Sequence, residues 1–479
     1  MNLPQEFLSS LQNLPGFDLA SFSNVHAREQ VLVSVRLNPA KVSETQLKEH
    51  FLQLKDAHGA PVLLHKIPWA THGYYLSGRP SFTLDPWFHA GCYYVQEASS
   101  MLIEQAIRQC VPISESLKVL DLCAAPGGKS TLIQTLIKEQ SLLVANEVIK
   151  SRANILEENV TKWGASNVIV TNNDPKDFQS LSDYFDLMVV DAPCSGSGLF
   201  RRDPDAITEW SLNNVQLCSQ RQQRILSDIL PALKENGILI YSTCSYSKEE
   251  DEQIMDWLVD EMGMESIALE MSTDWGVVYT QGDSRTHGYR CWPDQVQGEG
   301  FFLSCFKKRS SNECIAPPKL KKTSLETASK QELASIESWW GPLTQFKIYK
   351  QESYFFCLSP HFTEDLLRFQ QAKLYIKKAG ILLGKLAGKD FIPEHALSLS
   401  QLESGSILAV EMEKEVALHY LRREEVGVEE LKVTQGMQIK TGWAFVQYKG
   451  IRLGWIKVLP QRINNYYPKE WRILKKENN

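Results

Sequence analysis

The feature that most constrains the fold of this chain is the alternation of short apolar runs and helix-like segments between residues 118 and 306. The first run ends in a Gly- and Pro-rich turn, and residues with helical periodicity follow it. We expect strands at 118–123, 142–147, 167–171, 186–191, 237–243 and 300–306, and helices at 129–137, 151–163 (stopped by Gly164), 212–234 and from 247 onward. This alternation predicts an α/β fold with a mostly parallel, doubly wound sheet that helices cover on both faces.

The length of 479 residues suggests about three domains. We expect a mixed α+β segment at residues 1–112, the sheet domain at 113–310, a linker and intermediate region at 311–390, and a β domain at 391–479. The part of the linker at 310–330 is rich in Ser, Pro and Lys, and the chain after 349 is strand-like and aromatic.

Composition excludes several classes of protein. Hydrophobic residues make up 43% and charged residues 23% of the chain, so a disordered or fibrous protein is not expected. A net charge of −6 argues against a wholly basic surface but not against local basic patches. No apolar run is long enough to span a membrane, and the start has no basic, signal-like region, so a cytoplasmic location is expected.

The ten cysteines include no C-x-x-C pair. We therefore expect neither a disulfide framework nor a zinc site, and no metal at all. A free cysteine is usually a small buried hydrophobe. We expect that role for six of the ten, namely Cys92, Cys110, Cys218, Cys305, Cys314 and Cys357.

A loop of small residues follows the first expected strand and opens the first helix. It consists of Cys123, Ala124, Ala125, Pro126, Gly127, Gly128 and Lys129. Small residues let a ligand approach the backbone, and a helix N-terminus offers free N–H groups to a nucleotide or a carboxylate. The loop matches neither the P-loop nor the G-x-G-x-x-G pattern. The alternative is a turn that only joins strand to helix.

Polar residues near the next strand ends could complete a cofactor site. Glu147 ends the second strand, where an acidic residue commonly holds ribose hydroxyls. Asp174 follows the third strand and could accept a hydrogen bond from an adenine amino group. Arg152 could contact the cofactor region, or form a salt bridge on its helix face.

Two cysteines and one carboxylate lie at the ends of the next two strands. Asp191 and Cys194 close the fourth strand in D-A-P-C-S-G, and Cys244 closes the fifth in S-T-C-S. Both loops should face one crevice, because ligands of such sheets bind at the carboxyl ends of the strands. Ser247 and Glu250 have capping-box spacing, so a helix should begin three residues after Cys244 and favour its thiolate. Inert, buried thiols are the alternative.

These three motifs, in this order, resemble the RNA cytosine-C5 methyltransferases of the Sun (NSUN) family. The resemblance implies a Rossmann-like class I methyltransferase domain that binds S-adenosylmethionine, with residues 123–129 at the methionine end, Glu147 at the ribose and Asp174 at the adenine. Residues 91–102 (GCYYVQEASSML) and a long C-terminal extension are similar to the bacterial branch called RsmF, which methylates small-subunit (16S) ribosomal RNA.

Cytosine C5 is a poor nucleophile, and thiolate addition at C6 turns the ring into an enamine whose C5 can take a methyl group. Asp191 is suited to a hydrogen bond with ring N3. Lys129 could orient Asp191 or the substrate, or remain a solvated lysine. The residues alone do not say which thiol attacks. The resemblance implies that Cys244 attacks and that Cys194 helps release the product.

Basic and aromatic residues could hold the RNA. Residues 433–479 contain nine basic and two acidic residues, a net charge of +7, with seven interleaved aromatics, a composition suited to RNA backbone and base stacking. The alternative is an aromatic core with a solvated basic face. Residues 442–455 are similar to strands of PUA-like RNA-binding domains.

Residues 35–39 (VRLNP) fit the family's N-terminal RNA-binding part. Arg201 and Arg202 could grip phosphates or lie in a surface turn.

The expected partner is RNA, either 16S ribosomal RNA or the small ribosomal subunit, bound by a monomer that needs no metal. Two alternatives remain open: a transfer-RNA cytosine methyltransferase, and an RNA-binding protein on a methyltransferase fold that has lost catalysis. An oxidoreductase is disfavoured because G-x-G-x-x-G is missing.

Overall fold

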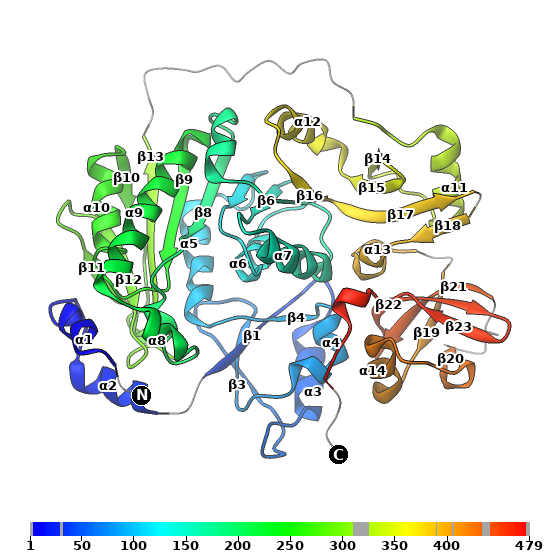
Figure 1. The fold of residues 1–479 in the computed structure, drawn as a ribbon, viewed down its shortest axis with the longest axis horizontal. Coiled ribbons are helices and arrows are strands. Elements are labelled where there is room, and N and C mark those ends of the chain that lie inside the picture. The colour runs from blue at the N-terminus through cyan, green and yellow to red at the C-terminus, as the bar shows by residue number, and fades with distance from the viewer. Residues whose placement is uncertain are drawn as a thin grey trace.

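The computed structural model describes residues 3–28, 32–309, 325–388, 390–404, 407–433 and 441–475. Within these residues the strands form four sheets, and the largest lies in the half of the molecule that contains the expected methyltransferase motifs (Figure 1). Cys314, Lys440 and Lys476, on which expectations were placed, lie outside the described residues.

The large sheet has the strand order β11-β12-β13-β9-β8-β5-β6-β7-β16, and β10 pairs with β13. The five consecutive strands from β7 to β9 are parallel, as the alternating pattern predicted, whereas the strands beyond them at both edges run antiparallel. The strands are β5 (Lys118–Asp121), β6 (Leu142–Asn146), β7 (Val168–Thr171), β8 (Phe185–Asp191), β9 (Leu233–Thr243), β10 (Met264–Ile267), β11 (Val278–Gln281), β12 (His287–Cys291), β13 (Phe301–Lys308) and β16 (Ile376–Ala379).

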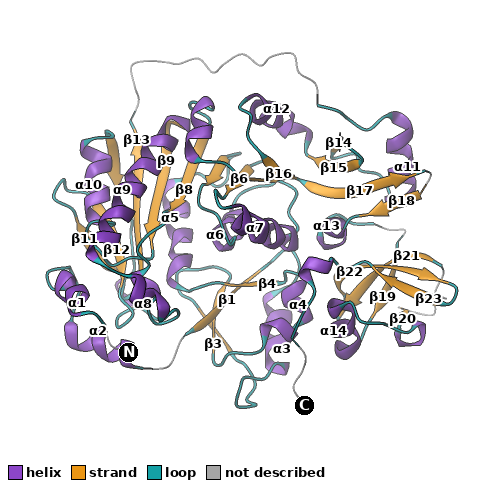
Figure 2. Ribbon diagram, in the orientation of Figure 1, coloured by secondary structure: helices purple, strands orange, loops and turns teal. Residues whose placement is uncertain are grey.

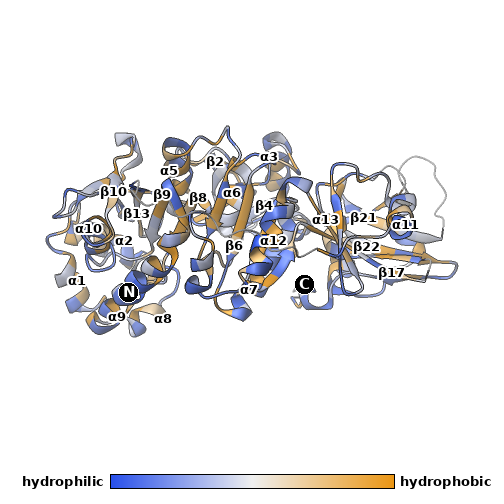
Figure 3. Cartoon of the chain, turned by 90° about the horizontal axis from the view of Figure 1, so that it is seen from above, coloured by the Kyte–Doolittle hydropathy of each residue, from blue (hydrophilic) through white to orange (hydrophobic). Residues whose placement is uncertain are grey.

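Helices cover both faces of this sheet (Figure 2). One face packs against α5 (Ile103–Cys110), α6 (Gly128–Leu136) and α7 (Lys150–Trp163). The other packs against α9 (Leu212–Ile229), α10 (Glu252–Asp260) and α12 (Thr363–Gln371). Successive strand residues such as Val119 and Leu120 enter opposite cores. Because each buried Val or Leu stabilises the fold by about 1.5–3 kcal/mol, the two apolar layers fix the sheet. Central strands such as β6 and β8 are accordingly coloured as hydrophobic in Figure 3.

Helix boundaries follow local chemistry, with differences from the sequence expectations. Helix α7 ends before Gly164, whose φ of +87° confirms the expected stop. The helix expected over 212–234 ends at Ile229, because Pro231 follows and cannot continue it. Strand β9 therefore begins at Leu233, four residues earlier than expected.

The N-terminal residues form a four-stranded sheet of order β2-β3-β1-β4. The C-terminal residues form a five-stranded sheet of order β20-β19-β21-β22-β23. The two share a single apolar core. Their elements are β1 (Val33–Leu37), β2 (Leu64–Lys66), β3 (Gly73–Leu76), β4 (Tyr93–Val95), α3 (Glu44–Gln53), α4 (Pro86–His89), β19 (Leu408–Glu411), β20 (Lys432–Val433), β21 (Gly442–Tyr448), β22 (Ile451–Leu459), β23 (Arg462–Asn465) and α14 (Lys414–Arg422).

Helices α1 (Gln5–Leu11) and α2 (Leu19–Ala27) do not join this core. They pack beside α8 (Asp205–Glu209), in a separate aromatic cluster that contains Phe22, Phe200 and Trp292. In Figure 1 they lie at the edge of the large sheet, next to α8.

The segment between the large sheet and the C-terminal sheet is itself folded. It contains a sheet of order β14-β15-β17-β18 and supplies β16 to the edge of the large sheet. The expected boundary at residue 390 falls inside β18, which pairs with β17. The elements are α11 (Lys330–Trp340), β14 (Lys347–Gln351), β15 (Tyr354–Leu358), β17 (Ile381–Ala387), β18 (Asp390–Pro393) and α13 (His395–Leu399).

The aromatic residues expected to stack on RNA are mostly core residues. Phe445, Tyr448, Trp455 and Tyr467 are all buried, so the packing alternative holds for them. Tyr466, at 38% exposure, is the most open of the aromatic residues that the structure describes in this segment. No helix among the described residues has the length and apolar character needed to cross a bilayer.

Candidate active site

The two cysteines at the ends of β8 and β9 meet. The sulfur atoms of Cys194 and Cys244 are 3.1 Å apart, and both residues are partly exposed. The meeting follows from the parallel pairing of β8 with β9, which places Asp191 opposite Ser242 and sends both loops over the same edge of the sheet. The structure therefore brings together the two thiols that the sequence singled out.

A carboxylate lies beside the thiols. Asp191 accepts hydrogen bonds from Lys129 Nζ at 2.6 Å and from Ser242 Oγ at 2.9 Å. Burial alone would lower the pKa of Lys129, but the charge of Asp191 and its hydrogen bond outweigh it and raise that pKa above its usual value. The Lys129 ammonium also lies 5.5 Å from the centre of the Phe301 ring. Neither Ser242 nor Phe301 was given a role beforehand, although Ser242 is the first residue of the S-T-C-S motif.

The helix expected to begin at Ser247 is absent, and this prediction was wrong. Helix α10 begins at Glu252, eight residues after Cys244. Glu250, expected to complete a capping box, instead accepts hydrogen bonds from Ser195 N, Ser195 Oγ and Ser245 Oγ at 2.5–2.8 Å. The buried Glu250 carboxylate thus binds Ser195 and Ser245, the residues that follow the two cysteines, and so links the two loops.

The two thiols differ in their surroundings. The hydrogen bond to Cys244, burial and the nearby Glu250 carboxylate raise the pKa of Cys194 well above the usual value of a thiol. Cys194 is therefore held in its protonated form, able to donate its S–H to the neighbouring sulfur. Cys123, in the loop after β5, also has a raised pKa, mainly because of burial, so it is unsuited to act as a thiolate.

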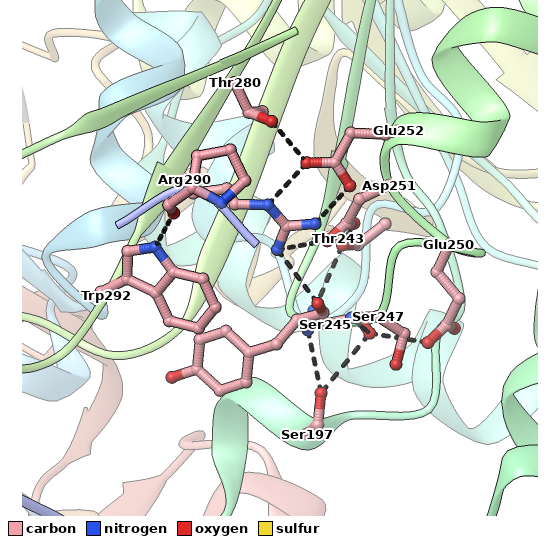
Figure 4. Close-up of polar contacts among 12 residues, drawn as sticks. Ser197, Thr243, Ser245, Ser247, Glu250, Asp251, Glu252, Thr280, Arg290 and Trp292 are labelled. Atoms are coloured by element: carbon pink, nitrogen blue, oxygen red, sulfur yellow. Dashed lines mark hydrogen bonds and ion pairs between the residues drawn. The ribbon is translucent and has the colours of Figure 1, made fainter. Parts of the chain in front are cut away.

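A second, unexpected network binds residues on both sides of Cys244, and Figure 4 shows its polar contacts. The buried Arg290 forms ion pairs with Asp251 and Glu252 and donates to the Tyr246 carbonyl at 3.1 Å. Thr243, which precedes Cys244, donates to Asp251 at 2.7 Å. An arginine within the apolar run 287–292 (HGYRCW) was the only sequence signal for this network.

Close backbone contact links the loops further. Gly198 N donates to the carbonyl of Cys244 at 2.8 Å. A Cβ at Gly198 would lie 2.7 Å from that carbonyl oxygen, so a side chain there would push the loops apart. Arg201, a candidate for gripping phosphates, is instead largely buried and pairs with Glu299 at 3.5 Å. Arg202 is exposed, and its phosphate role remains a prediction.

The residues of the first loop fit S-adenosylmethionine. Helix α6 starts after Gly127 without a side-chain cap, so its first N–H groups are available to the methionine carboxylate. The buried Glu147 carboxylate accepts a hydrogen bond from Ile149 N at 2.9 Å and lies 3.6 Å from Arg152, an arrangement suited to ribose hydroxyls. Arg152 also donates to the Ala125 carbonyl at 2.8 Å, which ties α7 to the loop. Asp174 caps a short helix after β7 and stays partly exposed.

Within the described residues, no group of three or more His, Cys, Asp or Glu side chains is arranged to hold a metal ion. A metal-free enzyme remains a prediction.

Solved structures share this fold. A methyltransferase homologue from Pyrococcus horikoshii is 27% identical, with a TM-score of 0.51 over 64% of this chain and 100% of the other. NSun6 from Pyrococcus horikoshii with SFG is 18% identical and has a TM-score of 0.54 over 64% and 99% of the two chains. The fold and the loop after β5 define a class I methyltransferase dependent on S-adenosylmethionine, as the sequence predicted.

Two relatives match over nearly their whole lengths. Ribosomal RNA small subunit methyltransferase F of Aeromonas hydrophila subsp. hydrophila is 30% identical and that of Aeromonas salmonicida is 29% identical, each covering 100% of this chain and 98% of the relative. The chain belongs to the ribosomal RNA small subunit methyltransferase F family, which confirms the resemblance to the RsmF branch.

Family models match three separate stretches. Residues 3–98 match the N-terminal domain of 16S rRNA methyltransferase RsmF, residues 110–307 match 16S rRNA methyltransferase RsmB/F, and residues 407–473 match the methyltransferase RsmF PUA domain. The PUA-like assignment of the C-terminal residues is thereby confirmed.

Proposed function

We propose that this protein methylates C5 of a cytosine in 16S ribosomal RNA, with Cys244 as the nucleophile and Cys194 assisting release. The observation that carries the proposal is the pair of free thiols, 3.1 Å apart, beside the Asp191 carboxylate at the carboxyl edge of the sheet. The relatives named for the small ribosomal subunit support the choice of RNA.

The first step is addition of the Cys244 thiolate to cytosine C6. An S–C6 bond forms, and electron density moves through the ring toward N3. The proton lost by the Cys244 thiol is taken up at ring N3, and Asp191, which is paired with Lys129, accepts the resulting N3–H hydrogen bond and so stabilises the adduct. S-adenosylmethionine, when bound, supplies an electrophilic methyl group to C5.

The second step restores the aromatic ring. The C5 proton passes to a water molecule, the C5=C6 double bond re-forms as the S–C6 bond breaks, and Cys244 departs as a thiolate that recovers the proton held at N3. Cys194, protonated and in hydrogen-bond contact with Cys244, is placed to stabilise that departing sulfur.

A trapping experiment tests these roles. Cys194→Ala and Cys244→Ala are incubated with S-adenosylmethionine and 16S ribosomal RNA and run on a denaturing gel. We expect a covalent RNA–protein band for Cys194→Ala, because release is impaired, and none for Cys244→Ala. Cys218→Ala, a buried cysteine on α9 outside the site, is the matched control and should behave like the wild type.

The reversed pattern would exchange the roles of the two thiols. Undiminished methylation by both variants would refute the thiol mechanism. Transfer RNA in a parallel reaction tests the substrate, since trapping on transfer RNA alone would refute the ribosomal assignment.

A further inference from the structure

Three polar residues at the end of β1 point into the protein instead of toward solvent. They are Arg36, Asn38 and Lys41, and residues 35–39 were expected to form part of an RNA-binding surface. Arg36 and Asn38 are each 1% exposed. Asn38 donates to the Trp163 carbonyl at 3.0 Å, and Lys41 donates to the Lys162 carbonyl at 2.6 Å. These side chains therefore join the N-terminal sheet to the catalytic domain, and the burial of Arg36 and Asn38 leaves neither of them open to RNA.

Arg36 reaches the first two turns of α6, the helix that opens at the cofactor loop. It donates to the carbonyls of Gly128 at 3.1 Å and Thr131 at 3.2 Å, and to the Thr135 hydroxyl at 3.3 Å. It also donates to the Thr131 hydroxyl, which in turn donates to the Gly127 carbonyl at 2.8 Å. A continuous chain of hydrogen bonds thus runs from Arg36 to the residue that precedes α6.

The guanidinium is fixed from its other sides as well. Its Nε donates to Gln96 Oε1 at 2.9 Å, and its plane lies 4.6 Å from the centre of the Trp163 ring. Among the described residues no carboxylate forms an ion pair with it. Burial lowers its pKa to about 9, so it remains charged at neutral pH. A positive charge beside the start of α6 adds to the favourable field for an anion there.

We propose that Arg36 is a positioning residue for S-adenosylmethionine. It holds the first turn of α6 and contributes positive potential, so that the uncapped N–H groups of this helix can receive the methionine carboxylate. This role depends on the cofactor loop but not on the cytosine chemistry, so its failure and the failure of the proposed function can be distinguished.

Lys41 offers a matched control at the same interface. It is also a cation that donates to backbone carbonyls, but it is only partly buried, and its acceptors are Ala90, at the end of α4, and Lys162, near the C-terminal end of α7. Loss of Lys41 should weaken the contact between the domains without disturbing the start of α6.

The test measures the Kd of S-adenosylmethionine and of S-adenosylhomocysteine by calorimetry on the full-length chain. We expect Arg36→Met to raise both Kd values about tenfold, which corresponds to the loss of one hydrogen bond, while Lys41→Met stays within about twofold. We expect the KM for S-adenosylmethionine to rise in parallel, with kcat at saturating cofactor and affinity for 16S ribosomal RNA nearly unchanged.

Unchanged cofactor affinity in Arg36→Met would overturn the proposal, and so would an equal loss in Lys41→Met, which would indicate general loosening of the interface. If Arg36→Met does not fold, the same Kd measurements are made on Thr131→Val. This variant removes only the hydroxyl that links Arg36 to the Gly127 carbonyl. A severalfold rise in Kd supports the proposal, whereas wild-type affinity refutes it.

Discussion

Asp191 links the charged and polar side chains of the site. One carboxylate oxygen is bound by Lys129 and the other by Ser242, and 31% of its side chain remains exposed toward the crevice. An aspartate bound in this way keeps its orientation while one edge stays open to substrate. Lys129 is its counter-ion, because Lys129 Nζ lies 2.6 Å from a carboxylate oxygen of Asp191.

We expect Asp191→Asn to lower the rate of methyl transfer about 10²- to 10⁴-fold, because an amide cannot stabilise the protonated ring as a carboxylate can. Single-turnover transfer of a labelled methyl group measures this rate. Ser242→Ala is the matched control, since it removes one contact to Asp191 but leaves the charge, and it should cost about tenfold or less. A rate for Asp191→Asn within twofold of wild type would remove Asp191 from the mechanism.

At the scale of elements, the loop after β9 depends on a buried charge network. Arg290 on β12 is 1% exposed and holds Asp251 and Glu252 at the start of α10, together with the Tyr246 carbonyl. Tyr246 also stacks on Trp292, with ring centres 5.0 Å apart and planes 7° apart. The position of Cys244 is thus set from outside its own strand.

Arg290→Met should therefore destabilise the protein by about 3–5 kcal/mol, because it leaves two buried carboxylates without a counter-charge. We also expect kcat to fall about 10- to 100-fold with little change in the KM for S-adenosylmethionine, since the thiol loop moves and the cofactor loop does not. Urea unfolding and steady-state kinetics measure the two effects. Thr280→Val removes only one hydrogen bond to Glu252 and should cost about 1 kcal/mol. An unchanged urea midpoint in Arg290→Met would contradict the role of the network.

The sequence predicted those elements whose pattern is local. The central parallel strands and the loop at Cys123–Lys129 follow from apolar runs and turn residues that are close in the chain. The meeting of the two thiol loops follows from the rule that the carboxyl ends of parallel strands share one edge of the sheet. The helix at Ser247 was predicted wrongly because its capping signal, Glu250, bonds to Ser195, 55 residues away.

Other features rest on contacts between distant segments. Strand β16 adds to β7 across about two hundred residues, and Tyr375 beside it exchanges hydrogen bonds with Asn173 at 2.8 and 3.2 Å. No periodicity in a single segment encodes such a pairing. The contact of Arg36 with α6 was missed for the same reason. The sequence of a strand does not indicate which helix an arginine in it will bind.

At the scale of the whole molecule, the N-terminal sheet and the C-terminal sheet are one structural unit. Val35, Leu37 and Tyr93 of the N-terminal sheet share a core with Leu418 and Val446 of the PUA-like residues. Helix α14 packs on α4, and α4 packs on β22. Because Arg36 extends from this unit to α6, the orientation of the PUA-like residues and the cofactor loop are linked through a single body.

The apolar core shared by the N-terminal and C-terminal sheets predicts the effect of a substitution far from the site. Leu418→Ala on α14 should cost about 2–5 kcal/mol, because it opens a cavity in a core whose other wall belongs to the N-terminal sheet. Hydrogen exchange should then quicken in β1 and β3 as well as in β21 and β22, and calorimetry should show both parts unfolding together. Leu383→Ala, in the separate core beneath β17, is the matched control and should leave the exchange of β1 unchanged. If exchange in Leu418→Ala rises within residues 407–475 alone, the PUA-like residues fold independently, and their link to the cofactor loop through Arg36 does not exist.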